Sequence, residues 1–342
     1  MDVRRAEEIV RDFHARGYYP AAVCQVFNAR ETLGRFAVGE AAVDSWFDLA
    51  SVSKIICATM LFSLMDEGRL SPDDLALPYL DGAGEATKRR LKSVTLRQLL
   101  THTSGIAAWY PFYADGRPFF TALEHVLATT PEEQGMVYSD LNFMLLGLIF
   151  QRVSGLSLRE GLERYIRQGL DIREIAYGPV DPALCVPSCF GNQIEKEMCR
   201  ERGMAFDGWR EDGVAVRGEC NDGNAYYYWH GASGHAGVFA TAGALTKLCQ
   251  FYMNTARPAF VRAMEEDVCG RGLAFDKRET FPEGCGHSGF TGTSIYFSRA
   301  RDVGAVLLTN RLCRAPRGEA NMQDARRALH YALLGREAPK TV

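Results

Sequence analysis

A helix that is apolar on nearly all sides constrains the fold of this chain more than any other feature. An apolar run begins at Phe47 and becomes a helical pattern at Ser51, with apolar residues recurring at three- and four-residue steps over 55–65. Gly68 then stops the pattern. A helix of this kind lies inside a core, so the sequence predicts a large protein packed around it.

Ser51 and Lys54 are the polar residues at the start of this helix, spaced so that they share one face. We expect Ser51 in the first turn, where its hydroxyl feels the positive end of the helix dipole. An amine one turn later can reach that hydroxyl and take its proton, which is what a serine nucleophile requires. The alternative is a helix-capping serine followed by a lysine on a solvated face. The apolar neighbours Ile55, Ile56 and Cys57 weigh against that alternative.

Length and composition narrow the class of protein. The chain has 342 residues, 47% of them hydrophobic, which is enough for one large domain or two lobes. The net charge of -3 gives no electrostatic basis for binding nucleic acid or an anionic membrane. No apolar run approaches the roughly 18 residues of a membrane-spanning helix, and residues 1–8 contain no apolar signal segment. The ten scattered cysteines are predicted to be reduced thiols, and the protein to be cytoplasmic.

Predicted strands cluster at the two ends of the chain, and helices dominate the middle. Strands are expected at 21–28, 35–38, 293–297 and 303–308, and terminal helices at 3–15 and 322–334. Capping boxes at Thr95, Thr121 and Ser157 predict helix starts in the middle of the chain. The predicted fold is α/β (α+β), an antiparallel sheet flanked by the terminal helices, with a mostly helical lobe inserted. We expect 1–80 plus 235–342 to form the sheet lobe and 81–234 the helical lobe of one structural domain, with the active site between them.

Two further segments are candidates for the same cleft. Tyr138 lies just before a predicted helix that begins at Asp140, so its phenol can project from a loop. The alternative is an ordinary half-buried tyrosine. Residues 284–293 are rich in glycine and lead into a strand, so their backbone can approach a ligand and offer N–H donors to an oxyanion. The alternative there is a bulged strand or a turn.

These segments together resemble the serine β-lactamase and penicillin-binding-protein superfamily. The motifs that carry the resemblance are, in chain order, Ser51-x-x-Lys54, Tyr138-Ser139-Asp140 and His287-Ser288-Gly289. Residues 99–105, 234–239 and 307–311 add to it. The likeness is closest to the class C β-lactamase-like branch, which includes DD-peptidases, D-aminopeptidases and esterases, and it covers nearly the whole chain.

The resemblance implies a role for the residues of these motifs. Ser51 would attack an acyl carbonyl and form an acyl-enzyme, while Lys54 and Tyr138 would share the proton transfers. The backbone N–H groups of Ser51 and Phe290 would form the oxyanion hole. The motif residues expected to contact substrate are Asp140, His287, Ser288 and Gly289. Which of Lys54 and Tyr138 is the general base stays open, because both pKa values depend on burial and neighbours.

Two positions depart from the family pattern and bear on the substrate. Asp140 stands where many relatives carry Asn, so an ionised carboxylate can pair with Lys54 and raise its pKa, or repel an acidic substrate. His287 stands where other branches carry Lys, which removes a fixed charge that would hold the carboxylate of a β-lactam or peptide. Both changes favour a serine hydrolase of small esters or amides, esterase- or D-peptidase-like, with weak or no β-lactamase activity. The alternatives are a β-lactam-hydrolysing or penicillin-binding DD-peptidase and a non-catalytic binding or sensing module on the same fold.

Aromatic residues give the only indication of substrate chemistry. They cluster at 109–120 and 226–229, and Trp109 and Tyr110 are the candidates for substrate contact. In the cleft they would favour an apolar acyl or alkyl group, but such residues equally pack the core of a lobe. The predicted partner is a small-molecule ester, amide or peptide. No cofactor and no metal are predicted, and the oligomeric state is left open.

Other hydrolase classes fit the sequence less well. The residues that could form a zinc site are Cys185, Cys189, Cys199, Cys220, His230 and His235. The cysteines lack paired Cys-x-x-Cys spacing, however, and no His-Glu-x-x-His occurs. An α/β-hydrolase requires Gly-x-Ser-x-Gly, which no serine here satisfies. We expect His102 and His235, in glycine-bounded turns, to be hydrogen-bonded structural residues.

Overall fold

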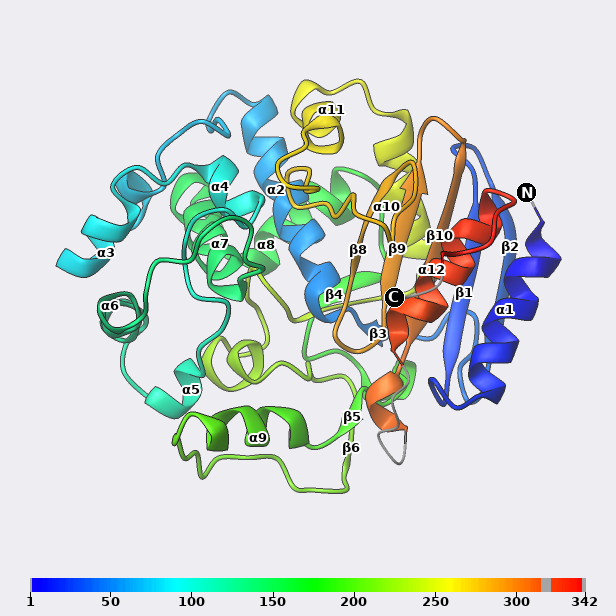
Figure 1. Cartoon of the computed structure of the whole chain (residues 1–342), viewed down its shortest axis with the longest axis horizontal. Helices are drawn as coiled ribbons and strands as arrows, with labels where there is room; N and C mark the ends of the chain where they lie inside the picture. Colours follow the sequence, from blue (N-terminus) through cyan, green and yellow to red (C-terminus); the bar gives the residue numbers. More distant parts are fainter. Residues whose placement is uncertain (1, 315–320, 340–342) are drawn as a thin grey trace.

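The computed structural model describes residues 2–314 and 321–339, and its largest element is a five-stranded antiparallel sheet in the order β2-β1-β10-β9-β8 (Figure 1). The strands are β1 (Ala22–Phe27), β2 (Thr32–Val38), β8 (Cys285–Ser288), β9 (Ser294–Ser298) and β10 (Val303–Thr309). β1 pairs with β10, so the first and last strands of the chain are neighbours. The prediction of an antiparallel sheet built from both chain ends is confirmed.

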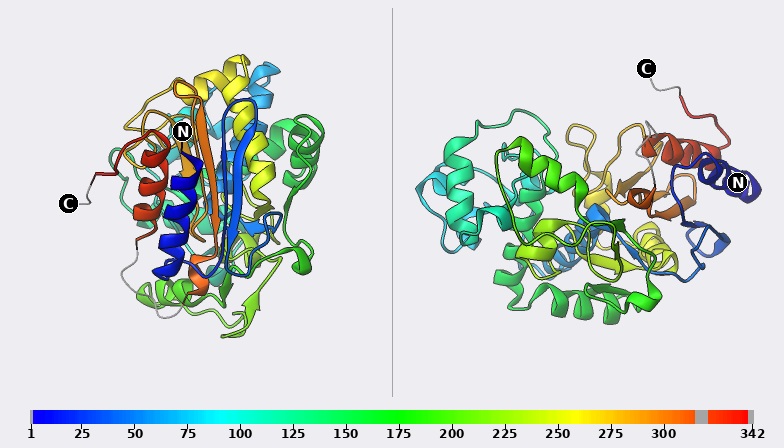
Figure 2. Two further views of the ribbon diagram at one scale, coloured as in Figure 1. Left: turned by 90° about the vertical axis from the view of Figure 1, so that its right-hand side faces the viewer. Right: turned by 90° about the horizontal axis from the view of Figure 1, so that it is seen from below.

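Helices cover both faces of this sheet. α1 (Val3–Ala15) and α12 (Met322–Leu333) lie side by side on one face, and α10 (Ala242–Asn254) packs on the other (Figure 2). Successive residues of β1 point to opposite faces, so Val23 enters the core with α10 whereas Cys24 packs against α1 and α12. The sheet is therefore buried on both faces.

Helices fill the middle of the chain, with two small sheets among them. These helices are α3 (Glu85–Leu91), α4 (Leu96–Leu100), α5 (Phe112–Asp115), α6 (Phe119–Thr129), α7 (Asp140–Ser154), α8 (Leu158–Leu162) and α9 (Gln193–Glu201). A further helix, α11 (Pro258–Glu265), follows α10. One small sheet has the order β3-β7-β4, from β3 (Phe47–Asp48), β7 (Val238–Ala240) and β4 (Ile175–Tyr177), and the other pairs β5 (Cys189–Phe190) with β6 (Ala215–Val216). Strands this short show no alternating pattern, so the sequence did not predict most of them.

Two of the three predicted capping boxes are confirmed. Thr95 and Ser157 cap α4 and α8 with reciprocal hydrogen bonds. The prediction at Thr121 is wrong, because α6 begins directly after Pro118. The Thr121 N–H donates to the Pro118 carbonyl at 2.9 Å, so Thr121 lies inside the first turn of the helix.

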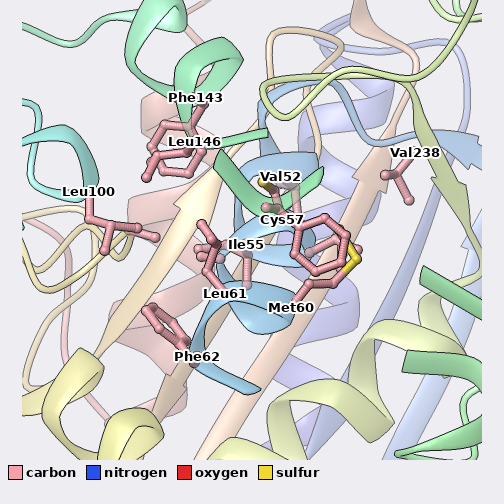
Figure 3. Close-up of a cluster of buried hydrophobic side chains, with 14 of the residues drawn as sticks. Val52, Ile55, Cys57, Met60, Leu61, Phe62, Leu100, Phe143, Leu146 and Val238 are labelled. Carbon is pink, nitrogen blue, oxygen red and sulfur yellow. The ribbon is translucent and has the colours of Figure 1, made fainter. Parts of the chain in front are cut away.

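α2 (Ser53–Asp66) is the helix around which the chain packs. All of its residues except the last are buried, and α7, α8 and α11 pack against it. Figure 3 shows its apolar side chains together with those of neighbouring elements, among them Leu100 and Val238. The predicted buried helix is confirmed, with one correction: Ser51 lies in a 3₁₀ turn, Ala50–Val52, that precedes the helix.

Within residues 2–314 and 321–339, no single helix combines the length and the apolar character needed to cross a membrane. α7 and the following segment Leu158–Gln168 meet those criteria only as a pair bent by 77°. Most of α7 is buried in the protein, where it packs against α2.

Candidate active site

Ser51 lies at a strained turn between β3 and α2. The preceding residue, Ala50, has a φ of 46°, a conformation that residues with a side chain rarely adopt. Its N–H donates to Asp48 Oδ1 at 2.9 Å, which helps to hold the turn. Because the turn leads directly into α2, the serine meets a lysine of the first helical turn: Lys54 Nζ is 2.8 Å from Ser51 Oγ.

The Lys54 side chain is completely buried and donates to three acceptors. These are Ser51 Oγ at 2.8 Å, Asp140 Oδ1 at 2.7 Å and the His235 carbonyl oxygen at 3.3 Å. Three donated bonds match an ammonium, since a neutral amine has only two N–H donors. Burial lowers the pKa of Lys54, but the Asp140 carboxylate and Tyr138 more than offset this, and the pKa is raised overall. Lys54 is therefore a charged ammonium in this structure.

The Tyr138 ring lies against Lys54, with its centre 4.8 Å from Nζ. The rings of His102 and His287 flank it at centroid distances of 4.5 and 6.0 Å. His102 is held by the hydrogen bond expected of it, since its Nδ1 accepts the N–H of Ser139 at 3.0 Å. The buried Tyr138 hydroxyl makes no hydrogen bond of regular geometry among the described residues, and it lies close enough to Lys54 to raise the pKa of that amine.

The turn between β8 and β9 packs directly onto the turn that carries the serine. Thr291 Oγ1 donates to the Asp48 carbonyl at 2.8 Å, and Thr293 Oγ1 donates to the Leu49 carbonyl at 2.9 Å. The two turns are therefore fixed relative to each other. The backbone N–H of Phe290, in the same turn, donates to no acceptor in the described parts of the chain and is free for an oxyanion.

Gly289 allows these two turns to approach closely, and its replacement gives a testable prediction. A Cβ at Gly289 would lie 2.5 Å from the Leu49 carbonyl oxygen, so Gly289→Ala must push the turn and the Phe290 N–H away from Ser51. We expect kcat for p-nitrophenyl acetate to fall by roughly 10²-fold with little change in KM, the cost of one displaced oxyanion donor. Gly243→Ala is the matched control, because a Cβ there meets nothing closer than 3.7 Å. An unchanged kcat in Gly289→Ala would remove Phe290 from the oxyanion hole.

These segments line one cleft of about 430 Å³. The residues expected at the site that line it are Ser51, Trp109, Tyr138, Asp140, His287, Ser288, Gly289 and Phe290. Lys54 lies beneath this surface, bonded to two of them. Three segments far apart in the sequence are thus side by side, with a hydroxyl, an amine and a phenol together.

Tyr110 does not line the cleft, contrary to the expectation from the sequence. Its hydroxyl donates to Asp115 at 2.5 Å, and its ring packs edge-on against Phe112. Other aromatic residues of the same clusters also pack on one another, for example Phe112 on Tyr228 at a centroid distance of 5.9 Å. Of these aromatic residues, all of which the structure describes, only Trp109 reaches the cleft. Packing of the helical region therefore explains the rest.

Comparison with known proteins identifies the family. The family model described as Beta-lactamase matches residues 6–329, nearly the whole chain. The chain belongs to the beta-lactamase family. It is a hydrolase of the serine beta-lactamase and peptidase type, as the resemblance implied.

The relatives of this beta-lactamase-family chain carry names that describe different hydrolases. An Escherichia coli O157:H7 protein named "Putative D-alanyl-D-alanine carboxypeptidase" is 26% identical over 308 residues, with 80% of this chain and 70% of the relative covered. A beta-lactamase/D-alanine carboxypeptidase from Pseudomonas syringae shares the fold with a TM-score of 0.71 and 16% identity, covering 98% of this chain and 99% of that one. EstCE1, a hydrolase with promiscuous acyltransferase activity, shares it with a TM-score of 0.68 and 17% identity, covering 96% and 98%.

His235 and Asp222 extend the site behind the lysine, and the sequence did not indicate Asp222. His235 Nε2 lies 2.9 Å from Asp222 Oδ1, and Ser233 Oγ lies 2.8 Å from His235 Nδ1. Asp140, Asp222 and His235 each offer one possible metal-ligand atom, and these three atoms lie within 4.8 Å of one another. The Lys54 ammonium, however, already pairs with Asp140 where a metal ion would bind. This is the one potential metal-ligand group among the described residues, and it contains no cysteine, so the cysteine–histidine zinc site is not assembled there.

His287 carries no charge at neutral pH, so this beta-lactamase-family cleft lacks the fixed cation that other branches place there. Burial, together with the nearby cations Arg271 and Lys54, lowers the pKa of His287 well below its usual range. Its Nδ1 lies 2.9 Å from the Ser288 carbonyl oxygen, and its Nε2 has no partner among the described residues. Because the carbonyl oxygen only accepts, the proton of the neutral imidazole lies on Nδ1, so Nε2 can accept one hydrogen bond from a substrate but cannot hold a carboxylate by charge.

Arg271 supplies a cation to the cleft that the sequence did not reveal. Only 3% of its side chain is exposed, and its guanidinium lies 5.3 Å from the centre of the Tyr138 ring. Asp276 lies 3.4 Å from Nη2, while Nε and Nη1 have no hydrogen-bond partner among the described residues. A buried guanidinium with unused donors is suited to bind an anion. No sequence pattern marks Arg271, because it is a single arginine in an irregular segment between α11 and β8.

Proposed function

We propose that this protein hydrolyses small esters or amides through an acyl-enzyme on Ser51, and that the leaving group of its substrates carries a carboxylate. The observation that carries the proposal is the Ser51 hydroxyl, which faces the cleft and accepts a hydrogen bond from the buried Lys54. A serine in this position becomes a nucleophile once its hydroxyl proton can pass to a base. The E. coli relative is named "Putative D-alanyl-D-alanine carboxypeptidase" and EstCE1 is named as a hydrolase with promiscuous acyltransferase activity, and both names are consistent with the proposed acyl transfer.

In the proposed mechanism, Ser51 Oγ attacks the acyl carbonyl carbon and its proton passes to the Lys54–Tyr138 pair. The carbonyl oxygen becomes an oxyanion held by the backbone N–H groups of Ser51 and Phe290. The pair then protonates the leaving oxygen or nitrogen as its bond to carbon breaks, which leaves the acyl-enzyme. Water attacks the acyl carbon with the pair again as base, and the acid and free Ser51 are released.

The Lys54–Tyr138 pair must lose one proton before it can act as a base. In the structure the Lys54 ammonium uses all three N–H donors, so it has no lone pair to accept the Ser51 proton. The reactive form therefore lacks one proton, on Lys54 or on Tyr138. Activity should accordingly rise with pH until the pair is deprotonated.

Arg271 supports the proposal of an anionic leaving group. It lies beside Tyr138, one member of the pair that is proposed to protonate the leaving group, so an anion bound at Arg271 would belong to that half of the substrate. The C-terminal carboxylate of a short peptide would meet this requirement. Arg271 thus replaces the charge that His287 lacks. A β-lactam also carries a carboxylate, so the same arginine favours β-lactam hydrolysis as the second candidate function.

Two matched esters test the anionic leaving group. The acetyl ester of 3-hydroxybenzoate should have a kcat/KM at least about 10-fold above that of the acetyl ester of methyl 3-hydroxybenzoate, because one charge-assisted hydrogen bond is worth about 1.5–3 kcal/mol. Arg271→Gln should abolish this preference. Arg278→Gln is the control, since the half-exposed Arg278 already binds Asp276 at 2.7 Å and should keep most of the preference. Equal rates for the two esters in the unmodified protein would contradict the anion site without bearing on Ser51.

A further inference from the structure

A small hollow of about 190 Å³ opens beside the cleft. Its apolar lining comes from Phe190 at the end of β5, Ile194 at the start of α9, and the side chains of Phe290 and Leu312. Phe190 and Phe290 are 42% and 40% exposed, an unusual degree for phenylalanine. Two exposed aromatic side chains that face one hollow mark a place where an apolar group can be bound.

The hollow borders the cleft beside the proposed oxyanion hole. Glu195, Asn221 and Phe290 line both spaces, and the Phe290 backbone N–H is a proposed oxyanion donor. Neither Tyr138 nor Arg271, which mark the leaving-group half, lines the hollow. A substrate group that enters the hollow from the carbonyl would therefore belong to the acyl half.

The acid on the shared wall is compatible with an apolar occupant. Glu195 is buried and accepts the Tyr113 hydroxyl at 2.8 Å and the Gly223 N–H at 2.7 Å. Burial, reinforced by the nearby Asp222 carboxylate, raises the pKa of Glu195 to about 8. At neutral pH this wall is therefore largely uncharged, and an alkyl or aryl group beside it does not desolvate an anion.

We propose that this hollow is the acyl-side specificity pocket, and that it selects substrates whose acyl group carries an apolar aliphatic or aromatic side chain. The inference rests on the proposed function, because it assigns the hollow to one half of the substrate of Ser51. Together with Arg271 it describes a substrate with an apolar acyl half and an anionic leaving half.

The acyl-chain dependence of ester hydrolysis tests the pocket. With kcat/KM normalised to hydroxide-catalysed hydrolysis, p-nitrophenyl hexanoate should exceed p-nitrophenyl acetate by at least about 10-fold, since each buried methylene is worth about 4-fold. Ile194→Trp, which fills the hollow, should bring this ratio to between about 1 and 2, and Phe190→Ala should lower it several-fold. Val214→Trp is the control: Val214 is 52% exposed next to β6 but does not line the hollow, so the ratio should be unchanged.

The outcomes separate this inference from the proposed function. A hexanoate-to-acetate ratio near 1 in the unmodified protein, or a high ratio that survives Ile194→Trp, would overturn the pocket while acetate turnover still supported Ser51. If Val214→Trp also lowered the hexanoate-to-acetate ratio to near 1, the pocket would be overturned too, because the chain-length preference would then not depend on the hollow. Absence of both acetate turnover and fluorophosphonate labelling would instead contradict the acyl-enzyme, and the pocket with it.

Discussion

Replacing Lys54 by alanine is expected to lower kcat/KM for p-nitrophenyl acetate at neutral pH by at least about 10³-fold. The substitution removes the donor that lies 2.8 Å from Ser51 Oγ and one member of the pair that carries the serine proton. Ser51 would remain in place but could not lose its proton at a useful rate. Lys247→Ala, at an exposed lysine of α10, is the matched control and should retain full activity.

Loss of activity in Lys54→Ala must be separated from loss of structure. The substitution leaves the Asp140 carboxylate, whose side chain is only 19% exposed, without its cation. We expect the free energy of unfolding to fall by up to about 3 kcal/mol, below the full cost of a completely buried unpaired charge. Urea unfolding gives this value and shows whether the variant is folded under assay conditions. A folded Lys54→Ala protein with turnover within about 10-fold of the unmodified protein would remove Lys54 from the mechanism.

Replacing Asp140 by asparagine is expected to move the rising limb of the pH–rate profile to lower pH. Asp140 Oδ1 lies 2.7 Å from Nζ and is a main cause of the raised pKa of Lys54. An amide keeps an acceptor for Nζ but removes the negative charge, so the Lys54–Tyr138 pair gives up its proton at lower pH. The deprotonated form of the pair is then already present at lower pH, and kcat/KM at pH 7 should rise several-fold. Measuring kcat/KM from about pH 5 to about pH 10 for both proteins gives the shift.

Asp171→Asn is the control for this profile, because Asp171 is 75% exposed and, among the described residues, forms an ion pair only with the surface residue Arg173. The rising limb of the pH–rate profile of Asp171→Asn should coincide with that of the unmodified protein. A limb in Asp140→Asn that stays in place or moves to higher pH would show that the Asp140 charge does not act on the group that titrates. The proposed proton count for the Lys54–Tyr138 pair would then be wrong.

The fold was predictable wherever the sequence repeats at a helical period or forms a long strand. The terminal helices were expected at 3–15 and 322–334 and are found as α1 and α12 within one residue at each end. Four of the five strands of the main sheet were also predicted, namely β1, β2, β9 and β10. β8 was not predicted, because it lies in the glycine-rich segment 284–293, which was expected only to lead into a strand. β4 to β7 are too short to carry a period, and they form only because the surrounding helices bring them together.

The residues of the candidate site likewise fall into those that a local sequence pattern indicated and those that none did. Ser51, Lys54 and Tyr138 belong to local motifs, so their meeting in one cleft could be expected before the structure was known. Arg271 and Asp222 belong to no motif, and only tertiary packing places them beside the others. The error at Tyr110 has a related cause, since an aromatic residue looks the same in sequence whether it packs a core or lines a pocket.

Intact-protein mass after incubation with a fluorophosphonate tests the central claim most directly, because the reagent reacts with an activated serine. The account predicts a single adduct on the unmodified protein and none on Ser51→Ala, and a parallel incubation with a penicillin would show whether the cleft also accepts a β-lactam. An unmodified protein that stays unlabelled by the fluorophosphonate, or an equal adduct on Ser51→Ala, would contradict the account and leave a binding module on the same fold.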